Sequence, residues 1–137
     1  MNDSTTLIAL DVGTKRIGIA RANSIAKIPE PLQTLNNDGH FNLKLNNLIH
    51  QHKANKLVVG LPRGLDGQNT QQTQFVLDFV ENLKQNINLD ISLQDEALTS
   101  VKAKEYLSST KKKKVFQKSD IDAVSAMFIL EDYLKGI

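Results

Sequence analysis

The sequence contains no cysteine and no tryptophan among its 137 residues, and only seven residues (five Phe and two Tyr) are aromatic. The absence of cysteine excludes disulfide bonds, thiolate zinc sites, iron–sulfur clusters and a thiol nucleophile. With so few aromatic side chains, a stacking platform for single-stranded nucleic acid is not expected. No segment approaches the roughly 18 consecutive apolar residues of a membrane span, and the polar start lacks the order of a signal peptide. We therefore expect a cytoplasmic protein that does not associate with membranes.

The charges nearly balance, with 17 Lys+Arg against 15 Asp+Glu and a formal net charge of +2. That total does not by itself indicate a nucleic-acid partner. Arginine is scarce, because all but Arg16, Arg21 and Arg63 of the basic residues are lysine. A chain of this length is expected to form a single domain over residues 1–137, with a core that needs no disulfide or metal.

Hydrophobic periodicity predicts an ordered series of strands and helices. Apolar runs at 7–10 and 17–22, joined by a tight turn, indicate a β-hairpin, and a third, edge strand is expected around 32–35. The elements expected beyond it are a helix over 41–52, a strand over 56–60, a helix around 76–83, a strand over 89–93, a short helix ending near 107 and a last, buried helix from about 119 to 134. An antiparallel hairpin followed by βαβ crossovers predicts an α/β fold with a mixed sheet and helices on both faces.

Acidic residues follow the strands that are expected to run parallel. Asp11 closes the first strand, Asp95 and Glu96 close the last, and Asp122 lies in the first turn of the final helix. Because open α/β sheets bind ligands at the carboxyl ends of their strands, we expect these side chains to share one crevice. Carboxylates held together need cations, and oxygen ligands without cysteine or histidine favour Mg²⁺ or Mn²⁺ over zinc.

Two such ions about 4 Å apart can activate a water and stabilise the leaving oxygen of a phosphodiester. Basic residues in the adjoining turns, Lys15, Arg16 and Arg63, are expected to bind the flanking phosphates by charge-assisted hydrogen bonds. The pattern therefore predicts metal-dependent hydrolysis of phosphodiester bonds.

Each acidic residue also has a simpler interpretation. Asp11 alone is typical of a turn, the Asp95–Glu96 pair of an exposed strand end, and Asp122 of a helix N-terminus, where a negative charge is favourable. The prediction rests on their convergence rather than on any one of them. The Lys111–Lys114 run is more typical of a solvated loop, although it would also attract a polyanion.

Four motifs, in this order along the chain, resemble those of a known family. They are Asp11-Val-Gly-Thr-Lys-Arg-Ile-Gly18, Val59-Gly-Leu-Pro62 with Asp66-Gly67, Asp95-Glu-Ala-Leu-Thr-Ser100, and Ile121-Asp122 followed by Ser125-Ala126. Together they span nearly the whole chain and resemble the bacterial pre-16S rRNA nuclease family. That family is also described as Holliday-junction-resolvase-like and belongs to the RNase H-like superfamily.

The resemblance implies an RNase H-like fold with five strands, the first three antiparallel, and a cytoplasmic nuclease that processes the 5′ end of 16S rRNA. By motif position, Asp11, Glu96 and Asp122 would be the metal-binding catalytic carboxylates, with Lys15 and Arg16 facing phosphate. The implied substrate is structured pre-rRNA, with contacts to the pre-ribosome. One departure is Ala97, because family members usually carry an arginine there that would make a bidentate partner for carboxylate or phosphate.

Three other functions are compatible with the sequence. Resolution of four-way DNA junctions would require two active sites presented symmetrically, and hence a homodimer, so the sequence is compatible with a monomer or a homodimer. Ala97 also suggests a non-catalytic RNA-binding factor in ribosome assembly. Finally, Asp11-Val-Gly-Thr14 resembles the phosphate-binding opening of actin-like and sugar-kinase ATPases, but those proteins enclose the nucleotide between two domains and this chain supplies one.

Overall fold

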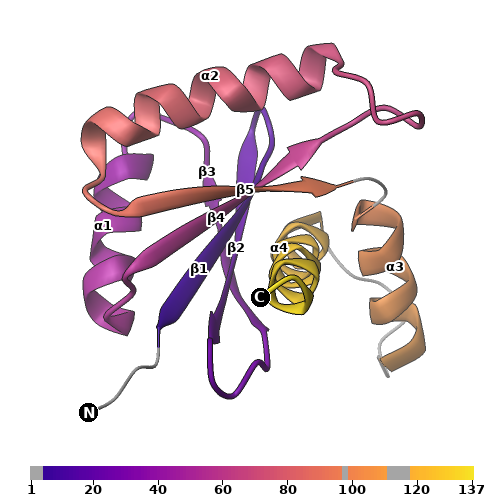
Figure 1. Ribbon diagram of the computed structural model, residues 1–137, viewed down its shortest axis with the longest axis horizontal. Helices are drawn as coiled ribbons and strands as arrows, with labels where there is room; N and C mark the ends of the chain where they lie inside the picture. The colour runs from indigo at the N-terminus through magenta and orange to yellow at the C-terminus, as the bar shows by residue number, and fades with distance from the viewer. Residues whose placement is uncertain (1–4, 97–98, 111–117) are drawn as a thin grey trace.

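A five-stranded sheet with the order β3-β2-β1-β4-β5 forms the centre of the computed structural model (Figure 1). The structure describes residues 5–96, 99–110 and 118–137. The strands are β1 (Thr6–Val12), β2 (Arg16–Asn23), β3 (Glu30–Asn36), β4 (Lys56–Pro62) and β5 (Asp90–Glu96). The helices are α1 (Phe41–His52), α2 (Gln71–Asn86), α3 (Thr99–Thr110) and α4 (Lys118–Lys135).

The sheet is mixed, as the sequence predicted. β1 pairs antiparallel with β2, and β2 antiparallel with β3. β4 lies parallel to β1 on its other side, and β5 lies parallel to β4. The carboxyl ends of β1, β4 and β5 therefore lie at the same edge of the sheet, where the acidic residues were expected to meet.

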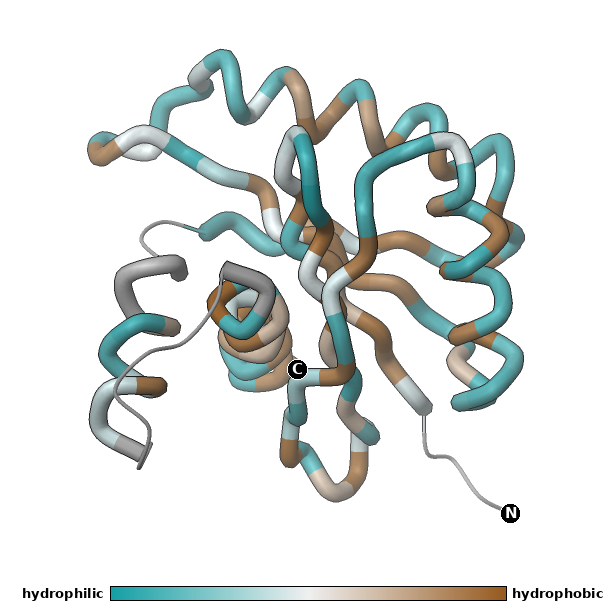
Figure 2. The backbone as a smooth tube through the Cα atoms, turned by 180° about the vertical axis from the view of Figure 1, so that it is seen from behind, coloured by the Kyte–Doolittle hydropathy of each residue, from teal (hydrophilic) through white to brown (hydrophobic). Residues whose placement is uncertain are grey.

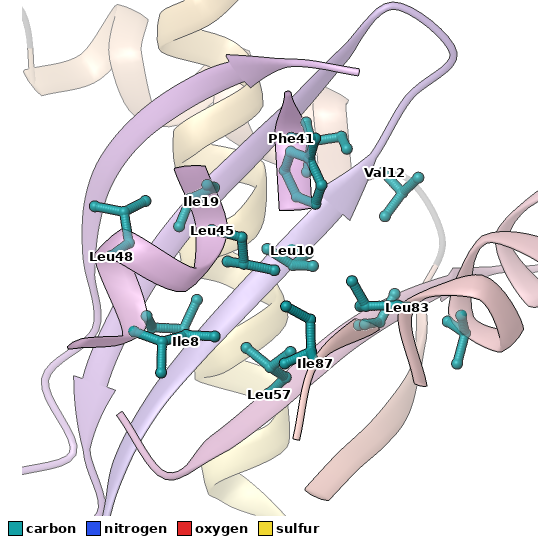
Figure 3. Packing of buried hydrophobic residues seen from close by; sticks show 14 of the residues in the cluster. Ile8, Leu10, Val12, Ile19, Phe41, Leu45, Leu48, Leu57, Leu83 and Ile87 are labelled. Atoms are coloured by element: carbon teal, nitrogen blue, oxygen red, sulfur yellow. The ribbon is translucent and has the colours of Figure 1, made fainter. Parts of the chain in front are cut away.

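Helices cover both faces of the sheet, which confirms the predicted layers. On one face, alternate residues of β1 (Ile8, Leu10 and Val12) pack into a core with α1 and α2 (Figure 3). On the other face, Leu7 and Ala9 pack with α4, and α3 lies outside α4 (Figure 1). Figure 2 shows the same layers from behind, with apolar segments in the strands and in α4. None of the described helices combines the length and apolar character needed to cross a membrane.

Small residues line the sheet face that α4 covers, namely Ala9, Gly18, Ala20, Ala22 and Gly60. A Cβ atom added at Gly18 would lie 1.9 Å from the backbone oxygen of Asp122. One added at Gly60 would lie 2.4 Å from Cδ1 of Ile129. The missing side chains therefore let α4 lie almost directly on the sheet, with its first turns over β2.

The start of α2 is fixed by a reciprocal cap. The Thr70 hydroxyl accepts from the backbone N–H of Thr73 at 3.2 Å, and the Thr73 hydroxyl accepts from the backbone N–H of Thr70 at 2.9 Å. Such a capping box satisfies two backbone donors that a helix start otherwise leaves unpaired. It ends the β4–α2 loop at a defined residue, so that the loop stays beside the carboxyl end of β4.

Candidate active site

Asp11 lies near the carboxyl end of the central strand β1 and is partly buried. Its neighbours Leu10 and Val12 point into the core formed with α1 and α2. Because successive side chains of a strand point to opposite faces, the Asp11 carboxyl lies on the face that α4 covers. Its partner across the antiparallel β1–β2 pair is Gly18.

Asp122 reaches the same place from the opposite end of the chain. It lies in the first turns of α4, whose backbone at this residue rests on Gly18. Gly18 in turn pairs with Asp11, so the two carboxylates are neighbours above adjacent strands. A glycine inside a strand often marks such a close approach of another backbone.

The electrostatics of Asp11 reflect this placement. Burial, and to a smaller extent the negative charge of Asp122, raises the pKa of Asp11 from 3.8 to about 7. Both causes disfavour the ionised carboxylate. A cation placed between the two groups would reverse the second cause, which is the arrangement expected of a cation-binding site.

Glu96 is the last residue of β5 and is buried, with 8% of its surface exposed. In the parallel β4–β5 pair, Val58 lies opposite Ser92 and Pro62 lies opposite Glu96. Val58 packs against α4, so the alternation along both strands places the Glu96 side chain on the α4 face as well. The structure thus brings Asp11, Glu96 and Asp122 to one edge and one face of the sheet.

As they stand, no three His, Asp or Glu side chains within residues 5–96, 99–110 and 118–137 are arranged to hold a metal ion. The donor set nevertheless fits a hard divalent cation, because it consists of carboxylate oxygens and lacks sulfur and imidazole. The raised pKa of Asp11 is in keeping with this fit, because a cation would stabilise the ionised form of a carboxylate that is buried beside a second carboxylate.

Arg16 supplies the positive charge that the site does contain. Its Nε donates to Oδ2 of Asp122 at 2.8 Å, which joins the first residue of β2 to α4. Lys15 is exposed in the turn just before it. Arg16 is thus bound to one of the carboxylates, and Lys15 precedes it in the chain; binding of phosphate by either residue stays a prediction.

The backbone of Arg63 lies beside Glu96, because its N–H donates to the Glu96 carbonyl at 3.1 Å, but its side chain has other partners. Its Nε donates to Oδ1 of Asp95 at 3.1 Å, and its Nη1 donates to the side chain of Asn69. Asp95 is largely exposed and, by strand alternation, points to the face opposite Glu96. The structure therefore pairs the Arg63 side chain with Asp95, on the face of β5 opposite Glu96. Binding of a flanking phosphate by Arg63 stays a prediction.

Sequence reasoning missed Asn37, which holds the turn between β1 and β2. Its Nδ2 donates to the carbonyl of Gly13 at 2.8 Å, and its backbone N–H donates to the carbonyl of Lys15 at 2.9 Å. Nothing in the local sequence indicates this contact, because it depends on how β3 pairs with β2. Ala97 and the Lys111–Lys114 run lie outside the described residues.

Comparison with known proteins supplies a family. The family model described as "RuvX: Holliday junction resolvase" matches residues 5–136. A protein of Sulfurihydrogenibium sp. (strain YO3AOP1) named "Putative pre-16S rRNA nuclease" is 42% identical over 130 residues, covering 93% of this chain and 88% of that protein. A protein of the same name from Rickettsia africae (strain ESF-5) is 40% identical over 133 residues, covering 96% and 86%.

Solved structures with the same fold include two resolvases bound to DNA. The structure described as "T. thermophilus RuvC in complex with Holliday junction substrate" superposes with a TM-score of 0.59 at 12% identity, covering 96% of this chain and 94% of that one. The fowlpox virus resolvase with its substrate Holliday junction DNA gives a TM-score of 0.54 at 10% identity, with coverage of 96% and 98%. At such low identity the match establishes the RNase H-like fold, which confirms the predicted fold class.

Proposed function

We propose a function from one premise: the chain belongs to the RuvX family of Holliday junction resolvases, and its relatives at about 40% identity carry the name of a pre-16S rRNA nuclease. From this premise we infer a metal-dependent endonuclease that hydrolyses phosphodiester bonds, with the 5′ region of pre-16S rRNA as its substrate. The observation that carries the proposal is the placement of Asp122 beside Asp11, where the burial of Asp11 and, to a smaller extent, the charge of Asp122 raise the pKa of Asp11 to about 7.

In this proposal Asp11, Glu96 and Asp122 hold one or two Mg²⁺ or Mn²⁺ ions. Such ions, when bound, supply an activated water and stabilise the leaving oxygen of the phosphodiester. The chain itself supplies the positions: strand β1 fixes Asp11, the end of β5 fixes Glu96, and the contact with Gly18 fixes Asp122. α4 shields this face of the sheet from water, which strengthens the interaction of the carboxylates with a cation.

The phosphate-binding side of the site is the turn between β1 and β2. Lys15 is exposed there, and its ammonium is a compact donor for a phosphate oxygen. The hydrogen bonds from Asn37 hold the turn against β3, so that Lys15 and Arg16 start from a fixed backbone. This geometry supports a role in holding the phosphates that flank the scissile bond.

The test is cleavage of an RNA fragment spanning the 5′ end of pre-16S rRNA by the purified chain. We expect specific cleavage with Mg²⁺ or Mn²⁺, none with chelator, and a loss of at least about 100-fold in rate for Asp11→Asn. Asp78→Asn is the matched control, because Asp78 is exposed on α2, on the other face of the sheet, and should leave the rate unchanged. Cleavage by Asp11→Asn at the parent rate would refute the assignment of the site.

A second candidate is resolution of four-way DNA junctions, favoured by the family description and by the junction-bound structures that share the fold. The same assay with a four-way DNA junction separates the two substrates. RNA cleavage with an uncut junction supports the first candidate, and paired cuts in the junction without RNA cleavage support the second. Tight RNA binding without metal-dependent turnover would instead favour a non-catalytic assembly factor.

A further inference from the structure

The ion pair between Arg16 and Asp122 joins residues that are 106 positions apart, and it lies inside the candidate site. Both side chains are partly buried, at 35% and 23% exposed, and Nε meets Oδ2 at 2.8 Å. Exposed pairs contribute little to stability, but shielding from solvent strengthens a pair such as this one. The arginine thus holds a carboxylate that the proposed function requires for a metal ion.

The positive charge of Arg16 partly replaces the charge that a metal ion would provide beside Asp122. Asp122 lies close enough to Asp11 to raise its pKa, so the two carboxylates repel one another unless a cation lies near them. Arg16 provides one positive charge, whereas a divalent ion would provide two. A guanidinium and a divalent cation on the same carboxylate repel each other, so the presence of one disfavours the other.

The backbone limits how Arg16 can respond. The N–H of Gly13 donates to the carbonyl of Arg16 at 2.9 Å, and Asn37 holds the carbonyls of Gly13 and Lys15. The position of the arginine Cα is therefore fixed, and only side-chain rotation can move the guanidinium. A guanidinium that leaves Asp122 remains in the turn that carries the exposed Lys15.

We propose that Arg16 pairs with Asp122 while no divalent cation is bound to the site. Binding of a divalent cation to Asp122 breaks this pair, and the guanidinium is then free to bind a substrate phosphate. The inference rests on the proposed function, because it assigns Asp122 to a metal. It gives Arg16 two successive anionic partners, a carboxylate first and a phosphate afterwards. The chain would then bind RNA through Arg16 only when the site holds a divalent cation.

The first experiment measures Mn²⁺ affinity by titration calorimetry and by electron paramagnetic resonance of free Mn²⁺, so activity is not the readout. We expect Arg16→Gln to bind Mn²⁺ about 3- to 10-fold more tightly than the parent, because the competing charge is gone. Arg16→Lys, which keeps the charge, should bind closer to the parent. Arg21→Gln is the matched control, since Arg21 pairs with Glu30 away from the carboxylates, and should bind like the parent.

The second experiment measures affinity for a labelled pre-16S RNA fragment by fluorescence anisotropy, with Ca²⁺ in place of a cation that supports cleavage. With Ca²⁺, Arg16→Gln should bind the RNA at least about 3-fold more weakly than the parent. With chelator, the two should bind equally, because Arg16 of the parent is held by Asp122. Thermal melts of each variant check that it is folded.

Unchanged or weaker Mn²⁺ binding by a folded Arg16→Gln would overturn the inference and leave the proposed nuclease intact. Equal losses of RNA affinity with chelator and with Ca²⁺ would also overturn it, since Arg16 would then contact RNA whether or not the site is loaded. Absence of Mn²⁺ binding in both parent and variant would overturn it together with the metal requirement of the proposed function.

Discussion

The environment of Asp11 differs strongly from that of an ordinary surface carboxylate. Its pKa rises from 3.8 to about 7 because it is buried and because Asp122 lies nearby. The folded protein therefore binds this proton more tightly than the unfolded chain does. As a result, the free energy of unfolding of the metal-free protein falls, for this group, as the pH rises from about 4 to about 7, and then stays level.

Asp11→Asn removes the unfavourable free energy of ionising a buried carboxyl group and keeps the size of the side chain. In the presence of chelator we expect the variant to unfold with nearly the same free energy as the parent near pH 4 and with about 1–3 kcal/mol more at pH 8. Urea denaturation at several pH values measures the difference. Asp78→Asn should show no such pH-dependent gain, and equal stabilities of Asp11→Asn and the parent at pH 8 would contradict the burial of a charge at this position.

The sequence predicted that Asp11, Glu96 and Asp122 lie at one edge of the sheet, because Asp11 and Glu96 lie at the ends of strands and Asp122 lies near the start of a helix. It did not predict that Arg63 pairs with Asp95, because this contact depends on the side of β5 to which the Asp95 side chain points. A shift of one residue along a strand reverses its face, so neighbours such as Asp95 and Glu96 serve different purposes. The pairing of Arg16 with Asp122 could not be predicted from the sequence either, because it joins distant residues through the packing of α4.

At the scale of elements, the contact between α4 and the sheet determines where Asp122 lies. The apolar character of the last helix predicted that it would be buried, but did not predict which strands it crosses. That information lies in the positions of Gly18 and Gly60, which leave room for the helix on two different strands. The two glycines differ in what they face: a rigid backbone at Asp122 and a flexible side chain at Ile129.

This difference predicts that substitution by alanine lowers the free energy of unfolding by different amounts at the two positions. Gly18→Ala should lower the free energy of unfolding by about 3 kcal/mol or more, because its methyl group meets backbone that cannot move alone. Gly60→Ala should cost about 1 kcal/mol, since Ile129 can change its rotamer. Chemical denaturation measures both, with Gly39→Ala as the control, because nothing lies within 4 Å of a Cβ atom there. Equal losses in the free energy of unfolding for Gly18→Ala and Gly60→Ala would contradict the close contact of the α4 backbone with Gly18.

The same substitutions connect packing to function. Gly18→Ala displaces the turn of α4 that carries Asp122, so any folded fraction of this variant should lose nuclease activity along with stability. Gly60→Ala acts further along α4, at Ile129, and should retain activity. The carboxylate site therefore depends on one close contact between a strand and a helix as much as on its acidic residues.

At the scale of the whole molecule, one copy of the chain contains the complete candidate site. β1, β5 and α4 of a single chain supply Asp11, Glu96 and Asp122, and the turn with Lys15 lies beside them. A cut in one RNA strand needs one such site. Resolution of a four-way junction requires two coordinated cuts, and hence two copies related by symmetry.

This distinction predicts the kinetic order of the reaction. With RNA in excess, the initial rate of pre-16S cleavage should rise in direct proportion to protein concentration, because each copy acts alone. Adding an excess of Asp11→Asn chains should leave the rate per active chain unchanged while the substrate remains saturating. A rate that rises with the square of the concentration, and falls when inactive chains are added, would mean that two copies must act together. That result would mean that a pair of chains carries out the RNA processing, with the same carboxylates in the same roles.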